Sequence, residues 1–268
     1  MKNDFHGKAV LITGGTKGIG LATGLAFGRA GAHVYLTHRW GSADEDEVRR
    51  LFADAGAARP PTIVEADASK DDETVRLLEK VHKEHDGLEV LVSNVCAVPV
   101  VEGIESLSKR GLLKSLDYSA WPFVAYLRQT KKILSRYPRY LIGTSSDGPD
   151  HYYQGYDYVA VVKAVMEVFC RYLSRQLLRE DIRINIVRTR NVITESALAI
   201  HGADYPDFVR KYGGEKHFVL ADEVGGTIFA LCSGLLDALS GQVITVDRGG
   251  SFSDNLFRLY HAREALGL

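Results

Sequence analysis

The sequence predicts a single α/β domain over residues 1–268, of the doubly wound type with a seven-stranded parallel sheet. Short apolar runs of strand length recur along the chain, and segments with helical periodicity separate them. This alternation is typical of a parallel sheet with helices on both faces, because parallel strands need long crossover connections. The length suits one domain with a substantial core, and the composition shows no linker.

Seven strands are predicted, in chain order, at residues 9–13, 33–37, 62–65, 90–93, 140–144, 183–187 and 243–246. Ligands of such a fold bind along the carboxyl ends of the strands. The long aromatic and charged segment 194–219 precedes the last predicted crossover helix, and we expect it to act as a substrate lid. The apolar residues of segment 251–268 recur at helical spacing, which predicts packing against its own core or against a neighbouring subunit.

The first predicted strand leads into a glycine-rich turn. Glycines there allow a tight bend with positive φ, and their missing side chains let phosphate oxygens approach the amides that open the next helix. Close helix packing alone also selects small residues, but a strand before the turn and a helix after it favour dinucleotide binding. The predicted cofactor contacts in this turn are Gly14, Thr16, Lys17, Gly18, Ile19 and Gly20.

Charge and composition exclude several classes of partner. With 33 basic and 34 acidic residues and no basic run, neither nucleic acid nor an anionic membrane is expected to bind. The first residues lack an apolar signal segment and no apolar run reaches spanning length, so we expect a cytoplasmic protein. Cys96, Cys170 and Cys232 are predicted to be small buried side chains. His82 and His85 lack a third ligand nearby in sequence, so we predict a solvated helix face and no metal site.

The motifs occur in the order that is typical of short-chain dehydrogenases/reductases, which the chain resembles over essentially its whole length. The resemblance implies a Rossmann fold, a nicotinamide cofactor and a homo-oligomer, either a tetramer or a dimer. It also implies that Asp67 contacts adenine, Asn94 lines the adenosine cleft and Thr194 contacts the cofactor. The matching motifs are Thr13-Gly-Gly-Thr-Lys-Gly-Ile-Gly20, Ala66-Asp67-Ala68, Ser93-Asn94-Val95-Cys96, Ser145-Ser146, Tyr156 with Lys163, and Gly241-Gln-Val-Ile-Thr-Val-Asp247.

The catalytic tyrosine departs from the usual family pattern, because Val159 stands four residues before Lys163. Two tyrosines lie nearby. Seven residues make nearly two helical turns, so Tyr156 shares a face with Lys163 about 10 Å away along the axis, whereas Tyr158 is rotated by about 140°. Geometry therefore favours Tyr156, at the entrance of the helix.

The Tyr-x6-Lys spacing and the segment 117–125 are similar to the enoyl-acyl-carrier-protein reductase branch of the family. That resemblance implies hydride transfer to the β-carbon of an α,β-unsaturated thioester, with negative charge accumulating on the carbonyl oxygen. Tyr156 would donate a proton or hydrogen bond to this oxygen, and Lys163 would hold the ribose and favour the negative charge. Ser146 is either a second donor to the oxygen or a turn serine.

The predicted nucleotide is NADPH. The second strand ends at Thr37-His38-Arg39 without the acidic residue that grips a free ribose 2′-hydroxyl, and both Arg39 and Lys17 offer positive charge. Arg190 occupies a position where the family usually has glycine near the nicotinamide, so its side chain must swing aside, the loop must move, or the pocket is altered. It is alternatively a ligand for an acidic group of the substrate.

Three functions remain open at this point. The first is an NADPH-dependent enoyl reductase acting on a carrier-bound or related acyl substrate, in fatty-acid or specialised metabolism. The second is a carbonyl reductase of the same family that uses Tyr156 as proton donor. The third is a non-catalytic NADP-binding module, suggested by Arg190 and by the missing standard tyrosine. Tyr152, Tyr153, Phe208 and Tyr212 either line an apolar substrate pocket or are ordinary packing residues.

Overall fold

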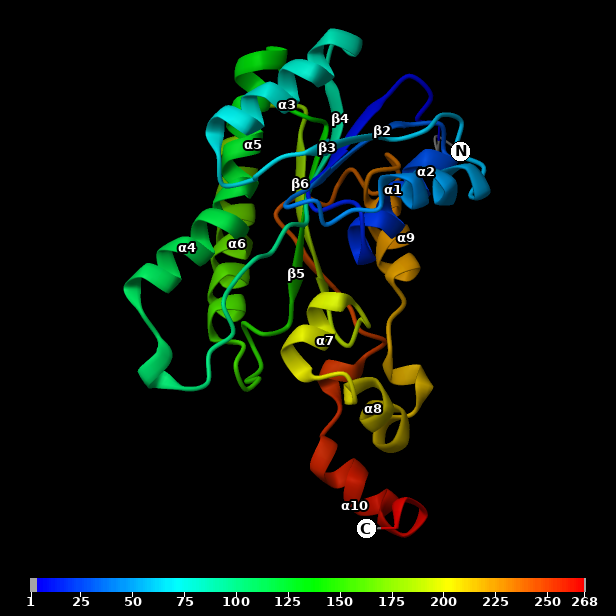
Figure 1. Cartoon of the computed structure of the whole chain (residues 1–268), viewed down its shortest axis with the longest axis vertical. Helices are drawn as coiled ribbons and strands as arrows, with labels where there is room; N and C mark the ends of the chain where they lie inside the picture. The colour runs from blue at the N-terminus through cyan, green and yellow to red at the C-terminus, as the bar shows by residue number, and fades with distance from the viewer. Residues whose placement is uncertain (1–3, 268) are drawn as a thin grey trace.

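A computed structural model describes residues 4–267, apart from the side chain of Ser196. Its centre is a seven-stranded parallel sheet in the order β3-β2-β1-β4-β5-β6-β7, which confirms the predicted fold class (Figure 1). The order reverses between β1 and β4, and this switch point is where a doubly wound sheet opens a crevice for a ligand. The strands are β1 Ala9–Ile12, β2 His33–His38, β3 Thr62–Glu65, β4 Leu88–Ser93, β5 Tyr140–Ser146, β6 Arg183–Thr189 and β7 Val243–Val246.

Helices cover both faces of the sheet. Helices α1, α2 and α9 lie on one face, whereas α3, α5 and α6 lie on the other with α4 packed beside α5 and α6 (Figure 1). The helices among the described residues are α1 Gly18–Arg29, α2 Glu45–Asp54, α3 Asp71–Glu84, α4 Lys109–Ser119, α5 Trp121–Leu134, α6 Asp157–Gln176, α7 Glu195–His201, α8 Tyr205–Gly213, α9 Ala221–Leu231 and α10 Asn255–Leu266, with short 3₁₀ turns η1 Ile104–Ser106, η2 Glu215–His217 and η3 Gly250–Phe252. Within the described part of the chain, no helix is both long and apolar enough to cross a membrane.

Two apolar clusters form the core, one on each side of the sheet. Alternate residues of the central strands supply both clusters: Val10 and Ile12 of β1 face one side, and Ala9 and Leu11 face the other. Strands buried on both faces therefore read as continuous apolar runs, which is why the sequence shows them clearly. Strands β5 and β6 each extend two residues beyond the predicted ends, because their pairing continues through Ser146 and Thr189.

The C-terminal segment differs from one expectation. It is helical, as α10, but it projects away from the body of the protein instead of packing on its core (Figure 1). Phe252, Leu256, Phe257 and Tyr260 are all exposed, with Phe252 97% accessible. The prediction that this segment packs on the protein's own core is therefore wrong, and packing against a neighbouring subunit stays a prediction.

Candidate active site

The glycine-rich turn joins β1 to α1 at the carboxyl edge of the sheet. Gly14 and Gly18 have φ values of 60° and 52°, in the left-handed region that favours glycine. A Cβ on Gly20 would lie 2.4 Å from the Gly14 carbonyl oxygen, so this position excludes any side chain. Helix α1 begins at Gly18, and no described side chain caps it. Its first amides are thus available to an anion, as a dinucleotide pyrophosphate requires.

Asn94 fixes the glycine-rich turn from the neighbouring strand. Its Nδ2 donates to the carbonyl oxygens of Thr13 and Gly14, at 3.2 and 2.9 Å, and its Oδ1 accepts from the Thr144 hydroxyl at 3.2 Å. The asparagine therefore connects the ends of β1, β4 and β5. Thr16 and Ala68, two other predicted contacts, are buried.

Tyr156 and Lys163 lie on α6, and Tyr156 is the residue that caps its N-terminus, as the helical geometry predicts. Lys163 is buried, and its Nζ donates to the Thr144 carbonyl oxygen at 2.8 Å. That bond places the ammonium group beside the end of β5, next to the residues that Asn94 holds. The apolar residues around Lys163 thus belong to a buried helix face, and the Thr144 carbonyl oxygen is the partner of the buried ammonium group.

The phenol of Tyr156 is perturbed by its surroundings. Burial raises its pKa to about 12, although the nearby Ser146 hydroxyl acts in the opposite direction. Ser146 Oγ is itself a buried atom without a well-aligned hydrogen bond to any residue in 4–267. The hydroxyls of Tyr156 and Ser146 therefore lie side by side at the end of β5. The Tyr156 hydroxyl has a raised pKa, and the Ser146 hydroxyl can still form hydrogen bonds.

Tyr158 has a different role. Its hydroxyl accepts from the Ser108 amide at 2.7 Å and donates to the Ser108 carbonyl at 3.0 Å. Both bonds tie α6 to the segment that begins α4. The side chain is buried in this contact, as expected for a residue rotated away from Lys163.

Arg39, predicted to bind the cofactor phosphate, is held firmly in place. Its Nη2 pairs with Asp67 Oδ2 at 2.6 Å, and its guanidinium carbon lies 3.9 Å from the ring centroid of Trp40 and 4.7 Å from that of Tyr118. The other terminal nitrogen, Nη1, is buried and has no hydrogen-bond partner within residues 4–267. Two residues predicted as separate contacts, Arg39 and Asp67, thus form one ion pair with a free donor.

Lys17 and Thr194 connect the glycine-rich turn to the segment that follows β6. Lys17 Nζ forms an exposed ion pair with Glu195 at 2.9 Å. Thr194 caps α7 by accepting from the Ala197 amide at 3.1 Å, and its methyl group lies beside Gly18. The predicted lid segment 194–219 therefore begins against the turn and continues as α7, α8 and η2.

Arg190 is turned toward a carboxylate. Its Nε lies 3.4 Å from Oδ2 of buried Asp147, which also accepts from the Tyr153 hydroxyl at 2.8 Å. The Arg190 side chain is therefore held by a carboxylate of the protein itself. Asp147 was missed by the sequence analysis, although its position directly after Ser146 at the end of a predicted strand was a usable signal.

Tyr156 packs against two aromatic rings, one from the preceding loop and one from the distant helix α7. His201 of α7 stacks on it, with ring planes 16° apart and centroids 6.2 Å apart, and Tyr153 packs edge-on at 5.5 Å. Burial lowers the pKa of His201. His201 was not predicted, since no pattern in the sequence links it to Tyr156. The segment after β6 therefore reaches the ring of the tyrosine that the resemblance implies to be catalytic.

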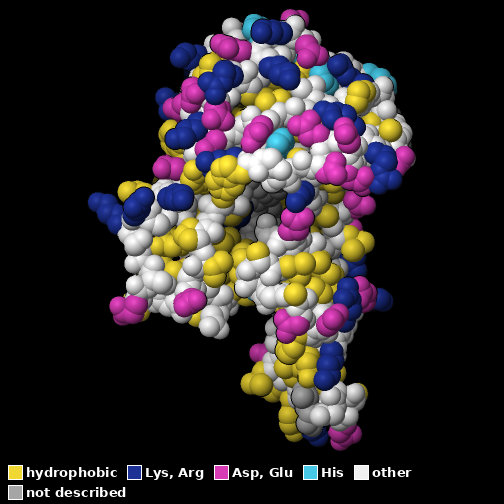
Figure 2. Space-filling model, in the orientation of Figure 1, with side chains coloured by type: hydrophobic (Ala, Val, Ile, Leu, Met, Phe, Trp, Pro, Cys, Tyr) yellow, Lys and Arg dark blue, Asp and Glu magenta, His cyan; other side chains and the backbone are white. Residues whose placement is uncertain are grey.

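A cavity of about 720 Å³, lined in part by Tyr156, lies between the start of α4 and the β5–α6 segment. Its walls are mostly apolar, including Leu107, Leu112 and Val161, and both Tyr152 and Tyr153 line it. Phe208 and Tyr212 instead pack on each other in α8, with ring centroids 4.6 Å apart. Figure 2 shows that the face of the molecule is hollowed near its centre, with hydrophobic side chains around the hollow.

Two expectations, one about the cysteines and one about the histidines, need correction. Cys170 and Cys232 are buried as predicted, but Cys96 is exposed, because it lies beyond β4 in the open segment at the carboxyl edge. His82 is solvent-exposed, whereas His85 is only partly accessible and contacts His33 of β2. A helix face that looks solvated in sequence therefore has one histidine turned inward.

Known proteins match the chain along most of its length. A family model described as "Enoyl-(Acyl carrier protein) reductase" matches residues 14–251. The chain is 26% identical over 253 residues to the enoyl-[acyl-carrier-protein] reductase [NADH] FabI of Aquifex aeolicus, and the match covers 91% of each chain.

Solved structures agree in fold. A short chain dehydrogenase from Burkholderia cenocepacia in complex with NADP has a TM-score of 0.80 at 20% identity, covering 92% of this chain and 99% of that one. The enoyl-[acyl-carrier-protein] reductase (NADH) from Aquifex aeolicus has a TM-score of 0.75 at 22% identity, covering 93% and 98%. The family model and the motifs together establish that this chain belongs to the enoyl-(acyl carrier protein) reductase family of the short-chain dehydrogenases/reductases, a family of oxidoreductases.

Proposed function

We propose that this protein is an NADPH-dependent enoyl reductase that reduces the C=C bond of an acyl thioester, carried by a carrier protein or by a smaller group. The observation that carries the proposal is the position of Tyr156. It caps α6 seven residues before buried Lys163, beside the Ser146 hydroxyl, at the sheet edge where the glycine-rich turn lies. The match of residues 14–251 to the enoyl reductase family supports this reading over other reductase chemistries.

The residues at the carboxyl edge fit a nicotinamide dinucleotide. The space that Gly20 leaves open and the uncapped start of α1 suit the pyrophosphate, and Lys163 suits the ribose. Asp67, Ala68, Asn94 and Thr194 line the proposed path of the rest of the nucleotide. When bound, the reduced nicotinamide supplies the hydride that the reaction requires.

Tyr156 is proposed to stabilise the charge that develops on the thioester carbonyl oxygen. Since burial raises its pKa to about 12, the phenol keeps its proton at neutral pH and is available as a donor. Ser146 Oγ offers a second donor, and the Lys163 ammonium favours negative charge nearby. The apolar cavity beside Tyr156 suits the acyl chain, and segment 194–219, which places His201 on Tyr156, suits a lid that excludes water.

The preference for NADPH depends on Arg39. One relative is named for NADH and one structural neighbour holds NADP, so membership of the family leaves the nucleotide open. The buried Nη1 of Arg39 has no partner within residues 4–267, and the Asp67 pair and the Trp40 and Tyr118 rings fix the orientation of the guanidinium group. A ribose 2′-phosphate would give this donor a charge-assisted hydrogen bond in addition to the Asp67 pair, whereas a 2′-hydroxyl would offer it only a neutral acceptor.

The test of the reaction uses one substituted tyrosine and a matched control. Tyr156→Phe is expected to lower kcat for NADPH-dependent reduction of a short 2-enoyl thioester by roughly 10²- to 10⁴-fold, since it removes one proton donor. Tyr158→Phe removes a hydroxyl two residues away whose hydrogen bonds among the described residues go to Ser108, and is expected to retain most of the activity. Product analysis separates C=C from C=O reduction when a 3-keto thioester is supplied in parallel.

Three outcomes would contradict the proposal. Reduction of the keto thioester alone would establish the carbonyl reductase alternative. Saturable NADPH binding without oxidation on either substrate would establish a non-catalytic module. Equal effects of the two tyrosine substitutions would remove Tyr156 from the reaction.

The nucleotide preference has its own measurement. Fluorescence titration of wild type and Arg39→Ala with NADPH and NADH is expected to show tighter NADPH binding in the wild type, lost in the variant. Tighter NADH binding by the wild type would contradict the assignment to Arg39 and leave the reaction class standing.

A further inference from the structure

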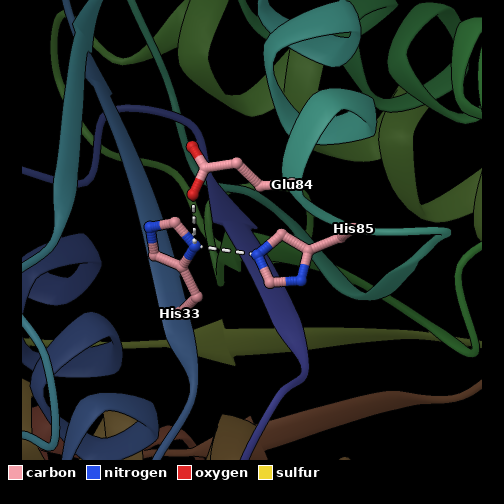
Figure 3. Close-up of side chains that lie close together, drawn as sticks. All are labelled: His33, Glu84 and His85. Carbon is pink, nitrogen blue, oxygen red and sulfur yellow. Dashed lines mark hydrogen bonds and ion pairs between the residues drawn. The ribbon is translucent and has the colours of Figure 1, made fainter.

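Three metal-ligating side chains converge far from the candidate active site. His33 begins β2, Glu84 ends α3 and His85 caps that helix (Figure 3). His33 Nδ1 lies 2.8 Å from His85 Nε2 and 3.7 Å from Glu84 Oε2, and all three ligand atoms lie within 4.8 Å of one another. The cluster sits where β2 begins, whereas the glycine-rich turn follows the end of β1, so the two sites occupy opposite edges of the parallel sheet.

Each imidazole has a hydrogen-bonding partner outside the cluster. His33 Nε2 lies 2.8 Å from Thr62 Oγ1, and the backbone of Gly7 hydrogen-bonds to the His85 ring. Metal-bound histidines almost always have the second ring nitrogen bonded to an oxygen, which fixes the tautomer and leaves the other nitrogen free for the metal. Both rings are therefore oriented as ligands, with their remaining nitrogens turned toward each other and toward Glu84.

Charge and burial at the cluster suit neutral imidazoles. Burial lowers the pKa of His33 to about 4, and burial also lowers the pKa of His85. Arg59 competes for the carboxylate, because its Nη2 lies 3.4 Å from Glu84 Oε2. The other facing groups are the Tyr35 hydroxyl, Lys80 and Asp86.

Two of the three ligand spacings require a small adjustment, and the third, between Glu84 and His85, lies within 4.8 Å. Zinc with bonds of about 2.0–2.1 Å in tetrahedral geometry places its ligand atoms roughly 3.3 Å apart. The His33–His85 distance would open by about half an ångström and the His33–Glu84 distance would close by a similar amount. Glu84, whose side chain is 42% exposed, is free to make this shift.

We propose that His33, Glu84 and His85 form a zinc-binding site, with water in the fourth position. Two imidazoles and a carboxylate are a ligand set that zinc accepts. The bound ion would tie the start of β2 to the end of α3 and stabilise the folded state. The sequence predicts no metal because the i, i+3 pair His82 and His85 lacks a convincing third ligand, and His82 is not part of the cluster. The fold supplies that ligand from a strand 52 residues away.

Binding is tested on the full-length, tag-free protein after treatment with EDTA, in a Cys96→Ser background that removes the exposed thiol. Zinc titration by calorimetry is expected to show one site per chain, and cobalt substitution is expected to give the intense visible absorption of a tetrahedral ion. His85→Gln and Glu84→Gln are each expected to weaken zinc binding by at least about tenfold, as loss of a ligand should exceed the loss of an outer-shell partner.

His82→Gln is the matched control, since it removes an exposed histidine from the same helix. It is expected to bind zinc as the wild type does. Failure of the wild type to bind below about 100 μM, equal binding by His85→Gln and wild type, or a weak octahedral cobalt spectrum would each overturn the proposal. In that case the His33–His85 contact is a hydrogen bond between neutral rings. None of these readouts uses the enzyme's activity, so the proposed reductase function stands or falls separately.

Discussion

Replacing His33 with glutamine should make the stability of the protein less sensitive to acid. The His33 side chain is buried at the start of β2, and burial holds its pKa at about 4, below the ordinary value of 6.5. Between these two values the unfolded chain binds a proton that the folded chain excludes, so the free energy of unfolding falls as the pH falls. The stabilisation is complete above pH 6.5 and is lost progressively toward pH 4.

The two pKa values set the size of the effect. Because the folded chain excludes this proton, the free energy of unfolding is about 2.5 kcal/mol lower at pH 4.5 than at pH 7.5. Glutamine is neutral at both pH values and keeps a polar group near Thr62 and His85. The free energy lost by His33→Gln between pH 7.5 and pH 4.5 should therefore be smaller than the wild-type loss by about that amount.

Urea unfolding at the two pH values, with EDTA present to exclude metal, measures this difference. His82→Gln is the control for loss of a histidine as such, because that side chain is exposed. The reasoning is refuted if the wild type and His33→Gln lose the same free energy on acidification, since buried His33 would then titrate as it does in the unfolded chain.

Three further substitutions test the site and its support. Gly20→Ala would bring a Cβ to 2.4 Å from the Gly14 carbonyl oxygen, so the turn would have to shift. A fluorescence titration should then show NADPH binding weakened more than tenfold, which is more than about 1.4 kcal/mol. Unchanged affinity would mean that the turn does not hold the cofactor. Glu167→Ala removes the buried partner of Arg188, whose Nη2 lies 2.6 Å from the carboxylate. Because Arg188 keeps Asp150 as a second partner, the free energy of urea unfolding should fall by about 1–3 kcal/mol; a loss below about 0.5 kcal/mol would contradict a desolvated pair. Tyr158→Phe should cost about 1 kcal/mol of stability and little activity, checked by thermal unfolding beside the kinetic assay, and a large fall in kcat with unchanged stability would make Tyr158 part of the chemistry.

The fold was readable from the sequence because its signals are local. Each central strand is buried on both faces, so Val10, Leu11 and Ile12 all had to be apolar, and the strand appears as an unbroken run. Gly14 and Gly18 mark the turn because their positive φ angles are costly for other residues. Within α6, the 3.6-residue period alone separates Tyr156 from Tyr158, and the contacts of Tyr158 with Ser108 agree with that separation.

The contacts between distant segments were decided only by tertiary structure. Strand pairing and crossover helices bring together residues that no spacing rule relates, because their proximity depends on the whole path of the chain. His201 stacks on Tyr156, Arg190 turns to Asp147, and Arg39 pairs with Asp67 in this way.

The sequence by itself therefore determined the sheet, the glycine-rich turn and the helix that carries Tyr156 and Lys163. Backbone conformation and one-sided burial act over a few residues and leave periodic traces in the chain. The tertiary structure decided which charged side chains form pairs and which histidines come into contact, as His33 and His85 do across 52 residues of sequence. Electrostatic and coordination partners are chosen by distance in space, and that distance exists only once the sheet has assembled.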